Sequence, residues 1–147
     1  MTMKKIVLKT VFFIFLLYIS NGMQAQNAAS NLAQLKLGQK FVGTWKQDVR
    51  KDSIEILENQ QYGNAFLENV YLIINGKKSL SYINNYCFPS EEGKYKGFFV
   101  WTNGSYMTWI GSFVTEEKFN VNFVKNFNPE SSVGETEINF DTQPIIL

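Results

Sequence analysis

Phe41-Val42-Gly43-Thr44-Trp45-Lys46 is the stretch that decides the fold, because its Gly-x-Trp pair opens a long series of alternating apolar and polar residues. Gly43 and Trp45 lie two apart, so on a β-strand they share one face. A Trp is normally buried with its N–H matched to an acceptor, and a nearby glycine lets backbone or a ring approach closely. The pair therefore predicts a first strand whose Trp45 forms the floor of a β-barrel; an ordinary core Trp on an ordinary strand is the alternative.

The residues after Phe41 alternate with a period of two, and hairpin-sized segments separate the alternating runs. One separator is Asn103-Gly104, which supplies the positive φ angles of a tight turn. No segment of crossover length lies between two runs, so parallel pairing cannot be built. An open sheet would leave two exposed edges, which closure removes. We therefore predict an all-β, eight-stranded antiparallel up-and-down barrel with a short N-terminal helix, its strands lying at 41–49, 53–59, 65–75, 79–88, 94–103, 106–115, 118–127 and 134–140.

Residues 1–25 have the composition of a secretory signal, with three lysines, an apolar run over 11–19 and a polar, small-residue stretch ending at Ala25. The apolar run is too short to span a bilayer, which needs roughly 20 residues. The only cysteine, Cys87, lies far from the expected cut after Ala25, so we expect no lipid anchor. The expected product is secreted or periplasmic, has no stable membrane insertion after signal cleavage and is typical of a bacterial protein.

Three segments are expected: a signal peptide over 1–25, a short helical leader over 26–40 and a barrel domain over 41–147. The leader is apolar on part of its surface, and we interpret it as a lid or plug. The runs 94–103 and 106–115 are apolar on both faces, so each needs a second cover besides the barrel interior. The leader could supply this cover, and a homodimer could also do so.

Composition argues against several function classes. Signal cleavage removes three lysines and no acid from a chain with 14 Lys+Arg and 13 Asp+Glu, so the product is slightly acidic and nucleic acid is not an expected partner. The chain has no histidine, the residue best suited to proton transfer near neutrality and the commonest metal ligand. We expect no enzyme, no catalytic residue, no metal and no cofactor. Cys87 falls inside a strand pattern and is expected to be a buried, inert thiol.

The signal, the leader, Gly43-Thr44-Trp45 on the first strand and eight meandering strands together resemble the lipocalin-like barrels of the calycin superfamily, in their small secreted bacterial form. The resemblance implies that Trp45 closes one end of the barrel and that the interior binds a ligand. In that family the tryptophan commonly meets an arginine from a late strand. Here no arginine follows Arg50, so only Lys118 or Lys125 could offer a cation, and the chain ends without the family's C-terminal helix.

Aromatic and amide residues are concentrated in the central strands. An eight-stranded barrel is wide enough either to be filled by side chains or to hold one small ligand, so both interiors stay open. If a cavity exists, its candidate ligand-binding residues are Trp45, Tyr71, Tyr82, Tyr86, Trp101 and Trp109. The leading hypothesis is a non-catalytic binding protein for a small hydrophobic or aromatic molecule. The alternative is a protein or glycan interaction module, as a homodimer or otherwise, that uses an exposed aromatic surface of a filled barrel.

Overall fold

The computed structural model describes residues 30–141, so the signal peptide predicted over 1–25 lies outside the described residues, as do the start of the leader and residues 142–147. Two compact units, Met1–Ala33 and Gln34–Leu147, make up the chain. The described part of the first unit, residues 30–33, is helical. The second unit carries the whole of the β-sheet.

Eight strands follow a short helical start in the second unit, and the sequence predicted each of them. Helical residues 34–37 run into the 3-10 helix η1 (Gly38–Phe41), and a second such turn is η2 (Pro129–Ser131). Every strand pairs antiparallel with the next along the chain, which confirms the up-and-down topology. The strands are β1 (Gly43–Arg50), β2 (Ser53–Tyr62), β3 (Ala65–Ile74), β4 (Lys77–Cys87), β5 (Tyr95–Trp101), β6 (Tyr106–Phe113), β7 (Lys118–Val124) and β8 (Gly134–Asn139).

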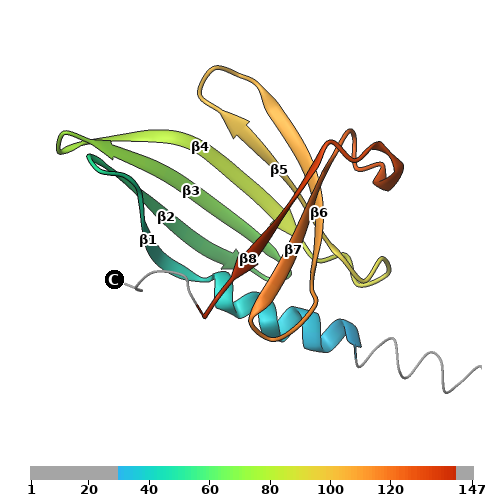
Figure 1. The fold of residues 1–147 in the computed structure, drawn as a ribbon. Helices are drawn as coiled ribbons and strands as arrows, with labels where there is room; N and C mark the ends of the chain where they lie inside the picture. The colour runs from blue at the N-terminus through green and yellow to red at the C-terminus, as the bar shows by residue number, and fades with distance from the viewer. Residues whose placement is uncertain (1–29, 142–147) are drawn as a thin grey trace, which may run out of the picture. The chain divides into compact units, whose positions relative to one another are not determined.

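The sheet is a curled half-barrel, with β1 and β8 as its edges. Among the described strands no backbone pairing joins β1 to β8, so the closure expected from the sequence is not made by hydrogen bonds. The strands converge at the end where η1 lies, here called the narrow end, and diverge toward the β3–β4 and β5–β6 turns, here called the wide end (Figure 1).

Tight turns fix the register of the hairpins. Asn75 and Gly76 join β3 to β4 with φ angles of 51° and 79°, the two positive values that a two-residue type I′ turn needs. A β-bulge after Val70 leaves Ser81 unpaired in β4, which raises the local twist of this hairpin. Such twist helps to curl a sheet that has no crossover helix to shape it.

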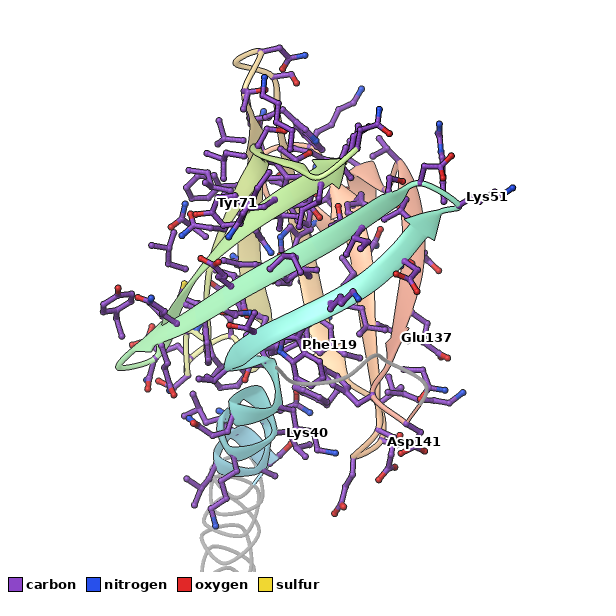
Figure 2. The ribbon with its side chains drawn as sticks, turned by 90° about the vertical axis from the view of Figure 1, so that its left-hand side faces the viewer. Lys40, Lys51, Tyr71, Phe119, Glu137 and Asp141 are labelled. Carbon is purple, nitrogen blue, oxygen red and sulfur yellow. The ribbon has the colours of Figure 1, made fainter. Side chains whose placement is uncertain are left out.

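An aromatic core fills the narrow end. Phe41 of η1 lies at its centre, with its ring centroid 5.0 Å from that of Phe119 and 5.2 Å from that of Phe140. Leu35 and Leu37 pack against the same cluster. Figure 2 shows Phe119 at this end of the sheet, close to the helical turn that carries Lys40. Leu35 and Leu37 of the predicted leader, together with Phe41 that follows it, therefore fill the narrow end with side chains.

The convex face of β6 and β7 is covered by the loop that contains η2. The Thr108 hydroxyl donates to the Val124 carbonyl oxygen at 2.6 Å and accepts from the Phe127 N–H at 3.3 Å. Thr108 and Val124 are both buried as a result. This loop is one of the second covers that strands with two apolar faces require. The loop does not cover Phe98 and Tyr106, whose side chains are 38% and 65% exposed.

The expectation for the cysteine was wrong. Cys87 lies inside β4, as predicted, but its side chain is exposed rather than buried. The alternation of β4 explains the difference, because Tyr86 and Phe88 face the core and the residue between them must face outward.

Candidate functional site

A cavity of about 190 Å³ lies on the concave side of the sheet. Its base is the aromatic core of the narrow end, represented by Phe41, Phe119 and Phe140, and its walls come from strands on both sides of the half-barrel. The wall residues include five aromatic side chains, namely Trp45, Tyr82, Tyr86, Phe99 and Trp109. The interior of the half-barrel is therefore only partly filled by side chains.

The aromatic wall is built around Trp109 of β6. Its register partner on β5 is Gly97, and the indole occupies the space that a side chain there would fill. The ring centroid of Trp109 lies 5.5 Å from that of Tyr86 and 6.2 Å from that of Phe99. The indole N–H donates to Asn84 Oδ1 at 3.0 Å, so the buried donor is satisfied and the ring is fixed in place.

A polar group interrupts the apolar lining. Asn59 of β2 and Glu68 of β3 are register partners, and they are only 4% and 8% exposed. Asn59 Nδ2 donates to Glu68 Oε2 at 3.2 Å and to the Tyr86 hydroxyl oxygen at 2.5 Å. Asn59 Oδ1 is buried and has no hydrogen-bond partner among the described residues. An unpaired buried acceptor is rare, because losing its hydration without a replacement bond is costly.

Burial shifts the titration of the carboxyl groups in the cavity. Loss of solvation raises the pKa of Glu68 to about 7, the nearby charge of Glu55 adds to this rise, and a hydrogen bond from Asn84 opposes it. Burial also raises the pKa of Glu55, which lines the same cavity. The pKa values of the Tyr82 and Tyr86 phenols are raised by burial and by the Glu68 charge, so both stay neutral at ordinary pH.

The structure brings together four of the six candidate residues predicted from the sequence. Trp45, Tyr82, Tyr86 and Trp109 line the cavity. Trp101 shares the concave face but lies beyond the cavity, with its ring centroid 6.0 Å from that of Tyr82.

Tyr71 does not line the cavity either. It lies one residue after the inward-facing Val70, on the opposite face of β3, where Lys78 Nζ sits 3.9 Å from the centre of its ring. Figure 2 shows Tyr71 well separated from Phe119, which does line the cavity.

Sequence reasoning did not assign polar residues of the lining to the site, among them Glu55, Asn59 and Glu68. The signal was present in the alternation, because Phe66, Glu68 and Val70 share one face of β3. A carboxyl between two apolar residues on the inward face marks a buried titratable group, and such groups are candidates for functional sites.

Within 30–141 no cluster of three or more Cys, Asp or Glu side chains is arranged to hold a metal ion.

No helix in the described part of the chain is long and apolar enough to cross a membrane.

The cavity thus combines aromatic walls, two carboxyl groups and one unpaired amide oxygen. Comparison of the chain with protein-family models, with curated proteins and with solved structures gives no match.

Proposed function

We propose that this protein is a lipocalin-like binding protein that holds a small hydrophobic or aromatic ligand in the concave cavity without transforming it. The observation that carries the proposal is the unfilled space of about 190 Å³ among the aromatic walls. Well-packed proteins leave few voids larger than a water molecule. Aromatic walls with a few placed polar groups are typical of a ligand site, and the small volume suits a small ligand.

The lipocalin-like assignment is supported by topology and by the position of Trp45. Eight sequential antiparallel strands curl around one space, and Trp45 of β1 lies at the narrow end. Its indole N–H donates to the Phe41 carbonyl oxygen at 3.0 Å, and the edge of its ring meets Phe140 at 6.3 Å between centroids. In this proposal the barrel closes at the narrow end through these side chains, and Phe140 takes the place of the family's arginine.

A binding role fits the polar groups of the cavity better than catalysis. Glu68 is the group there whose pKa of about 7 suits proton transfer. Its neighbours in hydrogen bonding are the amides of Asn59 and Asn84, which hold a carboxylate in place but do not relay protons. Export through the predicted signal at 1–25 is part of the same proposal.

The alternative interaction module is supported by the exposed rings of Phe98 and Tyr106. It requires a filled interior, however, and the cavity argues for the binding protein instead.

The test is a native mass spectrum of the protein purified without detergent, recorded for the wild type and two variants. Leu57 lines the cavity, so Leu57→Phe reduces its volume, whereas Leu80 is exposed and outside the lining, so Leu80→Phe is the matched control. We expect a mass excess that disappears on denaturation in the wild type and in Leu80→Phe, and its loss in Leu57→Phe. A ligand-free mass at twice the monomer would instead favour the interaction module.

A further inference from the structure

We propose that the polar end of the cavity selects ligands with a protonated amine, so that the ligand class is a small molecule with an ammonium group on an aromatic or apolar body. This inference rests on the proposed function and specifies its ligand. It is argued from the charge balance of the cavity, from the unpaired amide oxygen and from the size of the space.

Two carboxyl groups of the cavity have no basic partner among the described lining residues. Glu55 and Glu68 both line it, and no lysine or arginine occurs among the described residues of the lining. Three strand lysines form ion pairs with carboxylates outside the lining: Lys78 with Glu58, Lys96 with Glu92 and Lys118 with Glu137. Buried charges in proteins are normally paired, so a cation from outside the chain is the missing partner.

The unpaired Asn59 Oδ1 points to a hydrogen-bond donor on the ligand. Asn59 is 4% exposed, it lines the cavity, and its amide nitrogen is already used by Glu68 and Tyr86. The remaining oxygen can only accept. An alkylammonium group brings three N–H donors, which carboxylate oxygens and an amide oxygen can share.

The walls suit the rest of such a ligand. Tyr82, Phe99 and Trp109 present aromatic rings inside the cavity, and a cation close to an aromatic face is attracted to it. A dry cavity of about 150 Å³ can hold one benzene ring. The observed volume of about 190 Å³ therefore fits one ring with a short aminoalkyl chain.

Binding of a cation is coupled to the ionisation of Glu68. The titratable groups that face this carboxyl are Glu55 from β2 and the phenols of Tyr82 and Tyr86 from β4, and none of them is a cation. The raised pKa of about 7 means that Glu68 binds a proton below pH 7. The ammonium ligand must displace this proton, so its affinity should rise as the pH increases through 7.

The experiment is isothermal titration calorimetry of the full protein with three probes of similar shape: 2-phenylethylamine, the neutral 2-phenylethanol and the anionic 3-phenylpropionate. We expect 2-phenylethylamine to bind at least tenfold more tightly than either other probe at pH 8, and at least tenfold more tightly at pH 8 than at pH 5.5. The affinity for 2-phenylethanol should be the same at both pH values.

Three variants locate the effect. Glu68→Gln and Glu55→Gln should each lower the affinity for the amine at least tenfold and leave the affinity for 2-phenylethanol within twofold. Glu58→Gln is the matched control, because Glu58 lies on β2 with Glu55 but outside the cavity lining, where it pairs with Lys78. If Glu68→Gln does not fold, the half-buried Glu55 position and the comparison of probes on the wild type still decide the question.

The outcomes separate this inference from the function on which it rests. Equal or tighter binding of 2-phenylethanol or 3-phenylpropionate would overturn the preference for an amine and leave the binding function standing. Absence of binding by all three probes, together with a ligand-free native mass, would overturn both.

Discussion

Gly97 and Trp109 face each other across β5 and β6, and the indole lies where a side chain on Gly97 would have to be. A Cβ atom built on Gly97 would overlap the indole of Trp109, because it would lie only 2.6 Å from the indole nitrogen. Trp109 is buried and its N–H is bound to Asn84, so the ring cannot move without losing that bond. The glycine is thus the residue that allows the aromatic wall of the cavity to form.

Gly97→Ala is therefore expected to destabilise the fold by about 1–3 kcal/mol through overpacking, and to shift the fluorescence of Trp109. Urea denaturation measures the first effect and the emission maximum measures the second. Gly134→Ala is the matched control, because Gly134 has no positive φ and an added Cβ would lie 3.8 Å from Phe123, an ordinary contact. Equal stability of the two variants would show that Trp109 does not occupy the space over Gly97.

Glu68 should make the protein less stable as the pH rises. Its folded-state pKa is raised from 4.5 to about 7, so between these values the folded state holds a proton that the unfolded state has released. Stability is therefore lost with increasing pH across this window, by up to about 3 kcal/mol at 1.36 kcal/mol for each pKa unit. The burial of Glu55, whose pKa is also raised, acts in the same direction.

The measurement is the free energy of unfolding in urea at pH 5 and pH 8, for the wild type and for Glu68→Gln. The variant lacks the titrating group, so its free energy of unfolding relative to that of the wild type should increase from pH 5 to pH 8. Glu58→Gln, with its carboxylate on the other face of β2, should follow the wild type. If the difference in free energy of unfolding between Glu68→Gln and the wild type were the same at both pH values, Glu68 would not titrate in this window.

The side chain of Gln34 attaches the helical segment to the sheet. Its amide nitrogen donates to the Phe113 carbonyl oxygen and its amide oxygen accepts from the Phe113 N–H, both at 2.9 Å. Gln34→Ala should cost about 1–3 kcal/mol, because two part-buried backbone groups lose their partners. Gln60→Ala, which removes an exposed amide bonded to the Tyr62 hydroxyl on the same strand, should cost less than about 0.5 kcal/mol. Thermal unfolding compares the two, and equal losses would contradict this role of Gln34.

Most of the fold could be predicted from the sequence, because each strand depends on local patterns. Asn-Gly at 75–76 and the alternation on either side of it fixed the β3–β4 hairpin, and the structure has the same pairing. Closure was harder to predict, since it depends on whether the edges of β1 and β8 meet, which no local pattern encodes. At the narrow end Trp45 of β1 contacts the ring of Phe140, a single residue beyond the last strand.

The lining of the cavity could be predicted in part, and two physical reasons limit the prediction. Alternation assigns two faces but does not say which one is concave, so Tyr71 was grouped with Tyr82 although they lie on opposite faces. The contact between Asn59 and Glu68 could not be predicted from the sequence, because the two residues are nine positions apart and meet only through the β2–β3 register.

The exposed Cys87 should react readily with Ellman's reagent in the folded protein. Its position at the end of β4, between two inward-facing residues, leaves its thiol open to solvent. We expect one thiol per chain to react at a rate within tenfold of that measured in urea. Cys87→Ser should abolish the reaction and leave the melting temperature within about 2 °C, as expected for a surface substitution. Protection that urea removes would show that the thiol is covered in solution.

Trp45 offers a final test of how the half-barrel closes. The ring is half-buried, its N–H is bound to Phe41 and its edge meets Phe140, so it links β1 to the chain that follows β8. Trp45→Phe should cost about 1 kcal/mol for the lost hydrogen bond, and Trp45→Ala about 3 kcal/mol, at the lower limit for a core tryptophan. Trp101→Phe, at the wide end, is the control and should cost less than Trp45→Phe. An unchanged melting temperature in Trp45→Ala would show that the stability of the narrow end does not depend on this residue.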